Sequence, residues 1–182
     1  MNGTSKIVSA LSMAALLVMS SAHAAVTNND GTINFTGEII AAACTVDIGA
    51  NNTMTVDMGK VNKSVFTGAG SYASATEFDL KVKDCPETGV NGISVKFDGT
   101  AYNGDPSILA LTSDSGVATG VGIELLDNAQ KPISLFTASD AYPLPASQTT
   151  LTMPMFARYK QVDADVVAGK ANSTVQFTLN YN

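Results

Sequence analysis

Apolar and polar residues alternate along much of the chain after residue 30. A period of two residues is the pattern of a β-strand that buries one face. Gly, Asn, Asp and Ser interrupt these runs at short intervals, as turns do. Several short strands with frequent turns favour an antiparallel sandwich or barrel. The alternation predicts strands over residues 33–39, 54–58, 78–82, 93–97, 121–125, 153–159 and 175–181.

Two local features refine this pattern. Pro154 lies inside the run 153–159, which favours an edge position or a bulge because proline cannot donate a ladder hydrogen bond. Asp127 and Asn128 follow the run 121–125 and predict a turn. The chain after the N-terminus has no convincing helical period, internal repeat or charge block, so we expect one domain.

The first 24 residues have the layout of a secretory signal peptide. Lys6 is their only charge, an apolar run extends from Ile7 to Met19, and Ala22-His23-Ala24 forms a small-x-small cleavage site. The alternative is an N-terminal core helix. Cleavage after Ala24 would leave 158 residues, enough to bury a core. No later apolar run approaches the ~20 residues that span a bilayer, so we expect no stable membrane insertion.

Charge and composition disfavour several classes of function. The formal net charge is −6, and it becomes −7 once Lys6 is removed, so the phosphates of a nucleic acid would be repelled. The only histidine, His23, lies in the predicted signal peptide. Histidine-dependent nucleophilic sites and metal sites are therefore not expected in the mature chain. No pair of acids stands out, and we predict neither an enzyme nor a cofactor.

Cys44 and Cys85 are the only cysteines. In an exported chain an even pair predicts one disulfide, formed in an oxidising compartment such as the periplasm. It would close a loop of about 40 residues and contribute roughly 4 kcal/mol. The alternatives are a free thiol or a metal site, and two cysteines without histidine make a poor metal site.

The two ends of the mature chain carry the remaining information. Ile33, Phe35, Gly37 and Ile39 share one face of the first predicted strand, which follows the polar stretch Thr27–Asp30. Val175, Phe177, Leu179 and Tyr181 form an apolar face that reaches the C-terminus. A sandwich that ends on such a strand has an open edge unless another strand covers it. Pattern alone leaves open whether the covering strand belongs to the same molecule or to another.

Motifs along the whole chain resemble those of type 1-like fimbrial subunits, which the chaperone–usher pathway assembles. The run from Gly31 to Glu38 is similar to that family's donor strand, and Ala41-Ala42-Ala43-Cys44 to the segment after it. Residues 119–127 and 156–159 resemble typical interior stretches. The family also has a penultimate tyrosine and a glycine near the fourteenth position from the end, which correspond to Tyr181 and Gly169.

The resemblance implies an all-β fold: an incomplete immunoglobulin-like sandwich that a neighbouring subunit's donor strand completes. It implies a signal peptide over residues 1–24, a donor-strand extension over 25–40 and a pilin domain over 41–182. Ile33, Phe35, Gly37 and Ile39 would be donor residues, with Gly37 at a shallow or close-packed position. The acceptor groove and chaperone contact would comprise Gly169, Val175, Phe177, Leu179, Tyr181 and Asn182, whose terminal carboxylate the chaperone would hold.

The implied partners are other copies of the chain or related pilins, a periplasmic chaperone and an outer-membrane usher. The implied function is that of a structural subunit that reaches the bacterial surface through the periplasm, polymerises by donor-strand exchange and supports adhesion. The alternatives are a minor fimbrial subunit or an adhesin that binds sugars. Family tip adhesins usually carry an additional lectin domain, for which 158 residues leave no room, and the chain has no Trp for sugar stacking.

Overall fold

The computed structural model describes residues 31–37, 39 and 43–182, and these fall into two units, divided after Glu38. The predicted signal peptide, the stretch Thr27–Asp30, and residues 38 and 40–42 lie outside the described residues.

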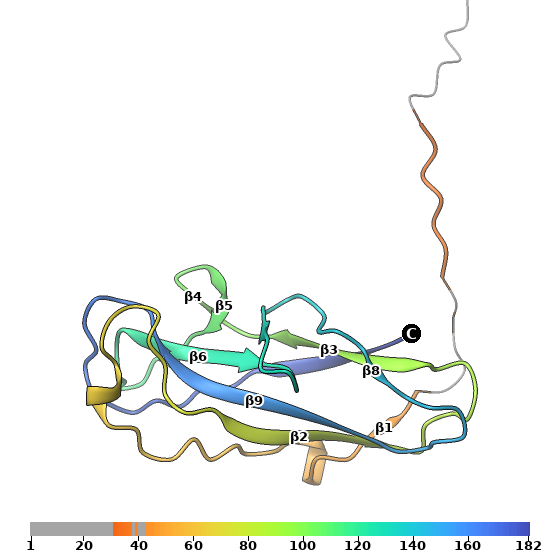
Figure 1. Ribbon diagram of the computed structural model, residues 1–182, viewed down its shortest axis with the longest axis horizontal. Coiled ribbons are helices and arrows are strands. Elements are labelled where there is room, and N and C mark those ends of the chain that lie inside the picture. The colour runs from red at the N-terminus through yellow and green to blue at the C-terminus, as the bar shows by residue number, and fades with distance from the viewer. Residues whose placement is uncertain (1–30, 38, 40–42) are drawn as a thin grey trace, which may run out of the picture. The chain divides into compact units, whose positions relative to one another are not determined.

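The domain that begins after Glu38 is built of strands in two antiparallel sheets (Figure 1). The larger sheet has the order β1-β2-β9-β6-β5-β4, with β7 paired to β6, and the smaller has the order β10-β3-β8. The strands are β1 (Thr45–Val46), β2 (Thr76–Lys83), β3 (Gly92–Asp98), β4 (Ala101–Tyr102), β5 (Asp105–Leu109), β6 (Val121–Leu126), β7 (Pro132–Ile133), β8 (Tyr142–Pro143), β9 (Leu151–Gln161) and β10 (Gln176–Tyr181). Two 3₁₀ turns, η1 (Ala50–Asn52) and η2 (Lys63–Val65), precede β2. The prediction of an all-β sandwich is confirmed.

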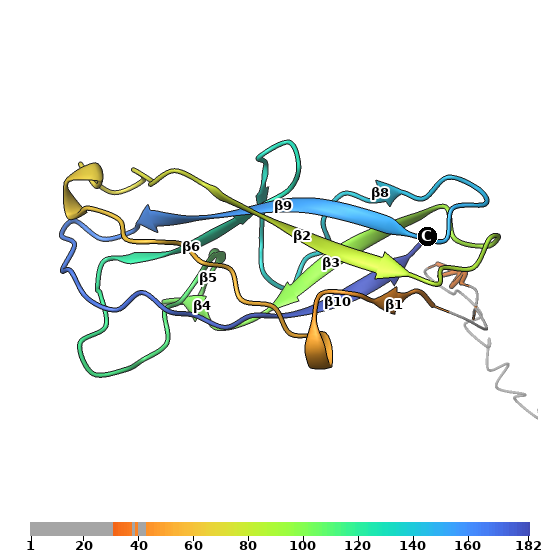
Figure 2. The same cartoon turned by 90° about the horizontal axis from the view of Figure 1, so that it is seen from below.

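The core lies between the two sheets, which Figure 2 shows from below. The smaller sheet contributes Ile93 and Val95 of β3, which have no exposed surface. The larger sheet contributes the inward parity of β2, β6 and β9, as the alternation predicts. Buried members of that parity are Leu80, Val82, Ile123, Leu125, Met153, Met155, Ala157 and Tyr159. Among the described residues, no helix is long and apolar enough to cross a membrane.

Three predictions along the chain need correction. Of the predicted strand over residues 33–39, the residues that the structure describes are in no strand. Residues 54–58 are in no strand, although their side chains alternate between half-buried and exposed. Pro154 is in β9, which is an interior strand paired with both β2 and β6. The β6 pairing ends at Phe156, so at Pro154 the only strand partner in the described residues is β2, which is why a residue without an N–H group is tolerated. The predicted turn after β6 is present, since the Asp127 carboxylate accepts from the N–H groups of Ala129 and Lys131.

The outward face of the larger sheet carries a buried ion cluster. Glu124 of β6 is 1% exposed and accepts from Arg158 and Lys160 of β9, with the closest N···O distance 2.6 Å for each. The Arg158 guanidinium lies 3.6 Å from the centre of the Tyr72 ring. Both oxygens of the buried carboxylate thus have a charged partner, as burial of a charge requires.

Candidate interaction groove

A groove of about 1460 Å³ opens along the edge of β10. One wall is β10 with the residues just before it, and the other wall is residues 52–59. The floor is apolar and comes from both sheets: Phe78, Leu80, Phe97, Leu109, Ile123, Leu125, Ala157 and Tyr159. The groove is therefore a slot between two chain segments, with its base formed by the core.

β10 forms the first wall with its free edge. Its other edge pairs with β3, from Gln176 opposite Asp98 to Tyr181 opposite Ile93, and it ends the order of the smaller sheet. Its side chains alternate between exposed and half-buried. The four residues that the sequence singles out here, Val175, Phe177, Leu179 and Tyr181, all line the groove. They pack against the core on one side and leave part of their surface to the groove.

The second wall is residues 52–59, which we call the facing segment. Met54, Val56 and Met58 are half-buried and line the groove, whereas Thr55 and Asp57 are exposed. Within the part of the chain that the structure describes, the backbone of residues 54–58 makes no ladder or other backbone–backbone hydrogen bond. The carboxylate of Asp57 accepts from the N–H of Gly59 at 2.9 Å. Both walls thus present polar backbone edges beside an apolar floor.

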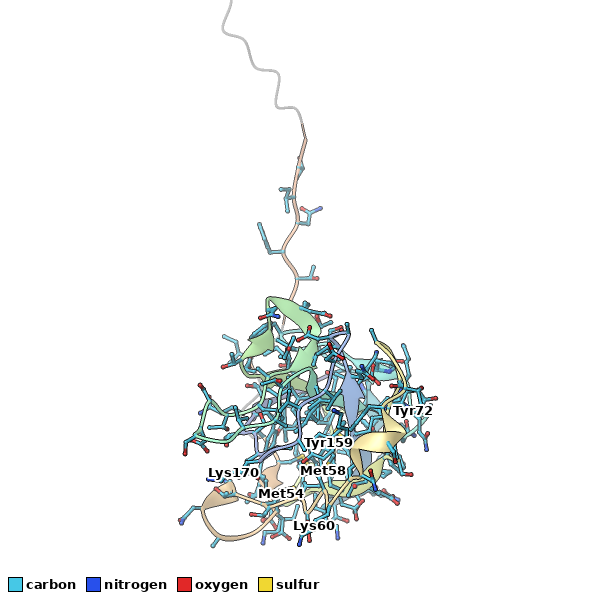
Figure 3. All side chains as sticks on the ribbon, turned by 90° about the vertical axis from the view of Figure 1, so that its left-hand side faces the viewer. Met54, Met58, Lys60, Tyr72, Tyr159 and Lys170 are labelled. Atoms are coloured by element: carbon cyan, nitrogen blue, oxygen red, sulfur yellow. A yellow bond between two sulfur atoms is a disulfide. The ribbon has the colours of Figure 1, made fainter. Side chains whose placement is uncertain are left out.

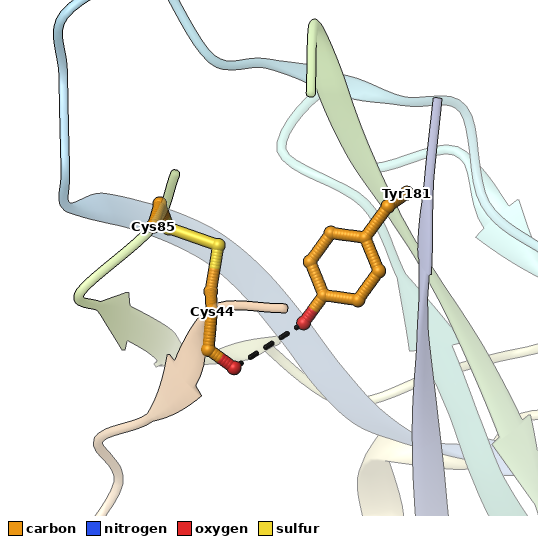
Figure 4. The surroundings of a disulfide bond; sticks show 3 residues. All are labelled: Cys44, Cys85 and Tyr181. Atoms are coloured by element: carbon orange, nitrogen blue, oxygen red, sulfur yellow. Dashed lines mark hydrogen bonds between the residues drawn. A yellow bond between two sulfur atoms is a disulfide. The ribbon is translucent and has the colours of Figure 1, made fainter. Parts of the chain in front are cut away.

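Two tyrosines of the groove lining donate hydrogen bonds to backbone carbonyls. The Tyr159 hydroxyl donates to the carbonyl of Ala171 at 2.8 Å, and burial followed by the nearby Asp57 charge raises its pKa. The Tyr181 hydroxyl donates to the carbonyl of Cys44 at 3.4 Å, and burial raises its pKa (Figure 4). Both side chains therefore stay neutral donors at physiological pH.

Cys44 and Cys85 are joined by a disulfide, which confirms the predicted pair. Both side chains are buried, at 8% and 4% exposed. Figure 4 shows the Tyr181 ring reaching toward Cys44 beside this bond. The end of β10 is thereby hydrogen-bonded to the residue directly before β1.

The structure puts the other two predicted acceptor residues outside the groove lining. Gly169 lies in the loop after β9, where a Cβ atom would come within 2.5 Å of the backbone nitrogen of Ala118 and the carbonyl oxygen of Gly116. Its glycine identity is thus explained by close backbone approach. The backbone N–H of Asn182 donates to Gly92 at 3.0 Å, and its oxygen accepts from Asn91 at 2.6 Å, which extends the β10–β3 pairing to the C-terminus.

We call residues 33–39 the arm. Its residues 33–37 belong to the first of the two units. The side chains of Ile33 and Phe35 are 80% and 92% exposed, and Ile39 is fully exposed. A Cβ atom on Gly37 would meet no atom within 4 Å. Large apolar side chains exposed in a row at alternate positions are costly in water, which indicates a segment that binds elsewhere.

The groove offers shape and apolar surface and no reactive constellation. In the described residues, no three His, Cys, Asp or Glu side chains gather as a metal site would require. The floor and the facing segment were not predicted from the sequence as parts of the groove. The inward parity of residues 78–80, 123–125 and 157–159 marks them as buried, but it does not distinguish a closed core from a groove floor.

Comparisons with known proteins point in one direction. A family model described as "Fimbrial protein" matches residues 33–182. Long polar fimbria protein A of Salmonella typhimurium is 37% identical over 97% of this chain and 96% of its own. The type-1 fimbrial protein A chain of Escherichia coli K12 is 34% identical over 96% of this chain and 94% of its own.

Solved structures agree with the fold. A Burkholderia pseudomallei antigen and type I fimbria protein superimposes with a TM-score of 0.58 at 37% identity, over 83% of this chain and 97% of its own. The P pilus rod subunit PapA superimposes with a TM-score of 0.62 at 22% identity, over 78% of this chain and all of its own. The second likeness concerns the fold alone.

Proposed function

This chain belongs to the fimbrial protein family and is a structural pilus subunit, and we propose that it polymerises by lending its arm to the groove of the next subunit. The observation that carries the proposal is the match between the two parts. Residues 33–39 present apolar side chains at three odd positions, with Gly37 at the fourth, and residues 175–181 present apolar side chains at all four odd positions along an open edge. An added strand would complete the smaller sheet and gain ladder hydrogen bonds.

The energetics favour this pairing. Ile33, Phe35 and Ile39 are almost fully exposed, so each gains roughly 1.5–3 kcal/mol when its side chain is buried. A register slip of one residue would turn all three toward solvent, which makes the register specific. Gly37 would occupy a point where the floor rises or the backbones approach closely. The facing segment could pair with the other edge of the added strand, because its backbone groups at residues 54–58 make no ladder.

The contact is directional. The arm of one subunit enters the groove of another, so the same interface repeats head to tail and need not close into a ring. A filament on the bacterial surface is the expected product. The role is structural, without a reaction or a cofactor, and it supports adhesion through the fibre.

Assembly would need a temporary occupant of the groove. An open slot with an apolar floor invites aggregation before the next subunit arrives. We propose that a periplasmic chaperone fills it with one of its own strands and holds the Asn182 carboxylate through basic residues, and that an outer-membrane usher exchanges this strand for the arm. Passage through the periplasm is supported by the predicted signal peptide and by the disulfide.

Deletion of residues 25–40 tests the proposal. In cells whose only copy of the subunit is truncated, we expect no fibres by electron microscopy, because no arm is available. The truncated domain should still bind a synthetic peptide of residues 25–40, which controls for folding. Normal polymerisation of the truncated subunit would show that the arm is not the link.

A further inference from the structure

Exposed apolar side chains gather at one end of the domain. Within residues 43–182, the large apolar side chains at least about a third exposed are Val61, Val65, Tyr72, Phe136 and Val167. Tyr72 covers the Arg158 guanidinium, and Phe136 lies in the loop after β7. The three valines come from the segment around η2 and from the loop that follows β9. Figures 1 and 2 both place these two segments at the same end, at the left of each view. We call Val61, Val65 and Val167 the end face.

Hydrogen bonds join the two segments to each other. The side-chain oxygen of Gln161, which is 2% exposed, accepts from the N–H of Gly68 at 2.9 Å, and its side-chain nitrogen donates to the carbonyl of Asp163 at 2.9 Å. The backbone of Gln161 pairs with Gly70 and Ser71. The valines are therefore exposed on well-anchored loops.

Gly169 fastens the same loop from its other side. Its close approach to residues 116–118 is accompanied by hydrogen bonds from Ala118 to Lys170 and from Thr119 to Val167. The glycine at this position thus helps to fix the position of Val167 in the loop. This role is separate from the lining of the groove.

The groove lining comes within a few residues of the end face along the chain. The lining includes Met58 and Gly59 on one wall and Ala171 on the other, and the next residues along each wall lead to the valines. Figure 3 looks onto this end of the domain, and in its projection Met54 and Met58 appear beside Lys60 and Lys170. Exposed charges here are mixed, with Lys60, Lys63 and Lys170 beside Asp163 and Asp165. A partner would therefore be held by apolar contact more than by net charge.

The length of chain between arm and domain decides which partner can reach this end. Only four residues, 40–43, separate Ile39 from the disulfide-bonded Cys44, so the two Cα atoms can lie at most about 18 Å apart. Antiparallel pairing is the more stable arrangement per residue. An arm that runs antiparallel to β10 has Ile39 beside residue 175, on the side from which the chain leads back through Ala171 to Val167.

We propose that the end face is a docking surface for a second copy of this chain, namely the body of the subunit whose arm fills the groove. This inference rests on the proposed function, and it adds a second contact between successive subunits. The docked surface of the donor is the part around its own Cys44–Cys85 bond, including the exposed residues 87–89. Burial of the three valines would limit the hinge motion between the two bodies.

Hydrogen exchange can separate the arm from the body. The first sample is a monomer whose groove is filled by a synthetic peptide of residues 25–40, which brings no donor body. The second is a two-subunit species, isolated by size exclusion, in which the donor's own groove holds the same peptide. We expect amides of residues 61–65 and 166–168 in the acceptor to exchange at least 10-fold more slowly in the two-subunit species, with no change around Phe136.

Equal exchange of these amides in the two samples would overturn the docking surface while leaving the arm contact intact. Failure of the peptide to slow exchange along β10 would overturn the proposed function, and the docking surface with it. A variant gives a second test: in fibres of V65D/V167D, the spread of angles between successive subunits should at least double by electron microscopy. Phe136→Asp is the matched control. An unchanged spread in the double variant, or an equal increase in the control, would also overturn the proposal.

Discussion

The side chain of Ile39 offers the sharpest test of how the arm binds. It is fully exposed, so its whole apolar surface is available for burial in the groove. Replacing Ile39 by Ala removes three carbons, and at about 0.8 kcal/mol for each, the loss is about 2.4 kcal/mol. A loss of this size corresponds to an affinity about 50-fold weaker. We therefore expect the Ile39→Ala form of a peptide of residues 25–40 to bind the arm-deleted domain about 50-fold more weakly than the parent peptide.

The measurement is the thermal unfolding midpoint of the arm-deleted domain, refolded with increasing concentrations of each peptide. Ligand that binds only the folded state raises this midpoint in proportion to the logarithm of its concentration over its Kd. Thr36→Ala is the matched control, because Thr36 lies on the opposite face of the strand from Ile39. If Thr36→Ala weakened binding as much as Ile39→Ala, the one-faced, strand-like insertion of the arm would be refuted.

Three further predictions concern stability of the peptide-filled domain, measured as the urea midpoint. Glu124→Gln should lower the free energy of unfolding by about 3 kcal/mol, because it leaves two cations at a buried site without their carboxylate. Asp79→Asn, at an exposed pair, should lower it by less than about 1 kcal/mol. Equal losses would contradict the burial argument. Replacing Cys44 and Cys85 together by Ser should cost about 4 kcal/mol, as expected for a closed loop of this length, and an unchanged midpoint would show that the loop is already constrained in the unfolded chain. Burial raises the pKa of Tyr142 above its ordinary value near 10, so above pH 10 the folded state keeps a proton that the unfolded chain releases. Stability should be full below pH 10 and fall above it, and Tyr142→Phe should make that fall shallower. An identical slope in the variant would exclude Tyr142 as a source of the pH dependence.

Strand positions were predictable wherever burial is one-sided and the ladder is regular. β2, β3, β6 and β9 contain the alternating runs that predict them, and β10 covers residues 176–181 of the predicted run 175–181. The facing segment shows the limit of that inference. Its alternation at Met54, Val56 and Met58 is present in the burial, yet residues 54–58 form no ladder within the described chain. Alternation reports which side chains face an apolar surface, and it does not report whether a strand lies alongside.

Positions that depend on long-range approach could not be predicted. Pro154 suggested an edge strand, but the relevant fact is where the β6 partner ends, and no local pattern encodes that. Gly169 has a role that arises from the backbone of residues 116–118, some fifty residues earlier in the chain. The floor of the groove draws on Phe78, Phe97 and Tyr159, which only the packing of two sheets brings together.

The disulfide has a mechanical consequence. In the proposed fibre, tension would enter each subunit through the chain just before Cys44. Without a cross-link, that pull would act on the two-residue strand β1 and then peel away the facing segment one contact at a time. The bond to Cys85 transfers load to the end of β2, which is paired with β9 at seven successive positions from Thr76 to Val82. A pull along β2 shears these positions together, so the clamp around the neighbour's arm would stay closed while the fibre is stretched.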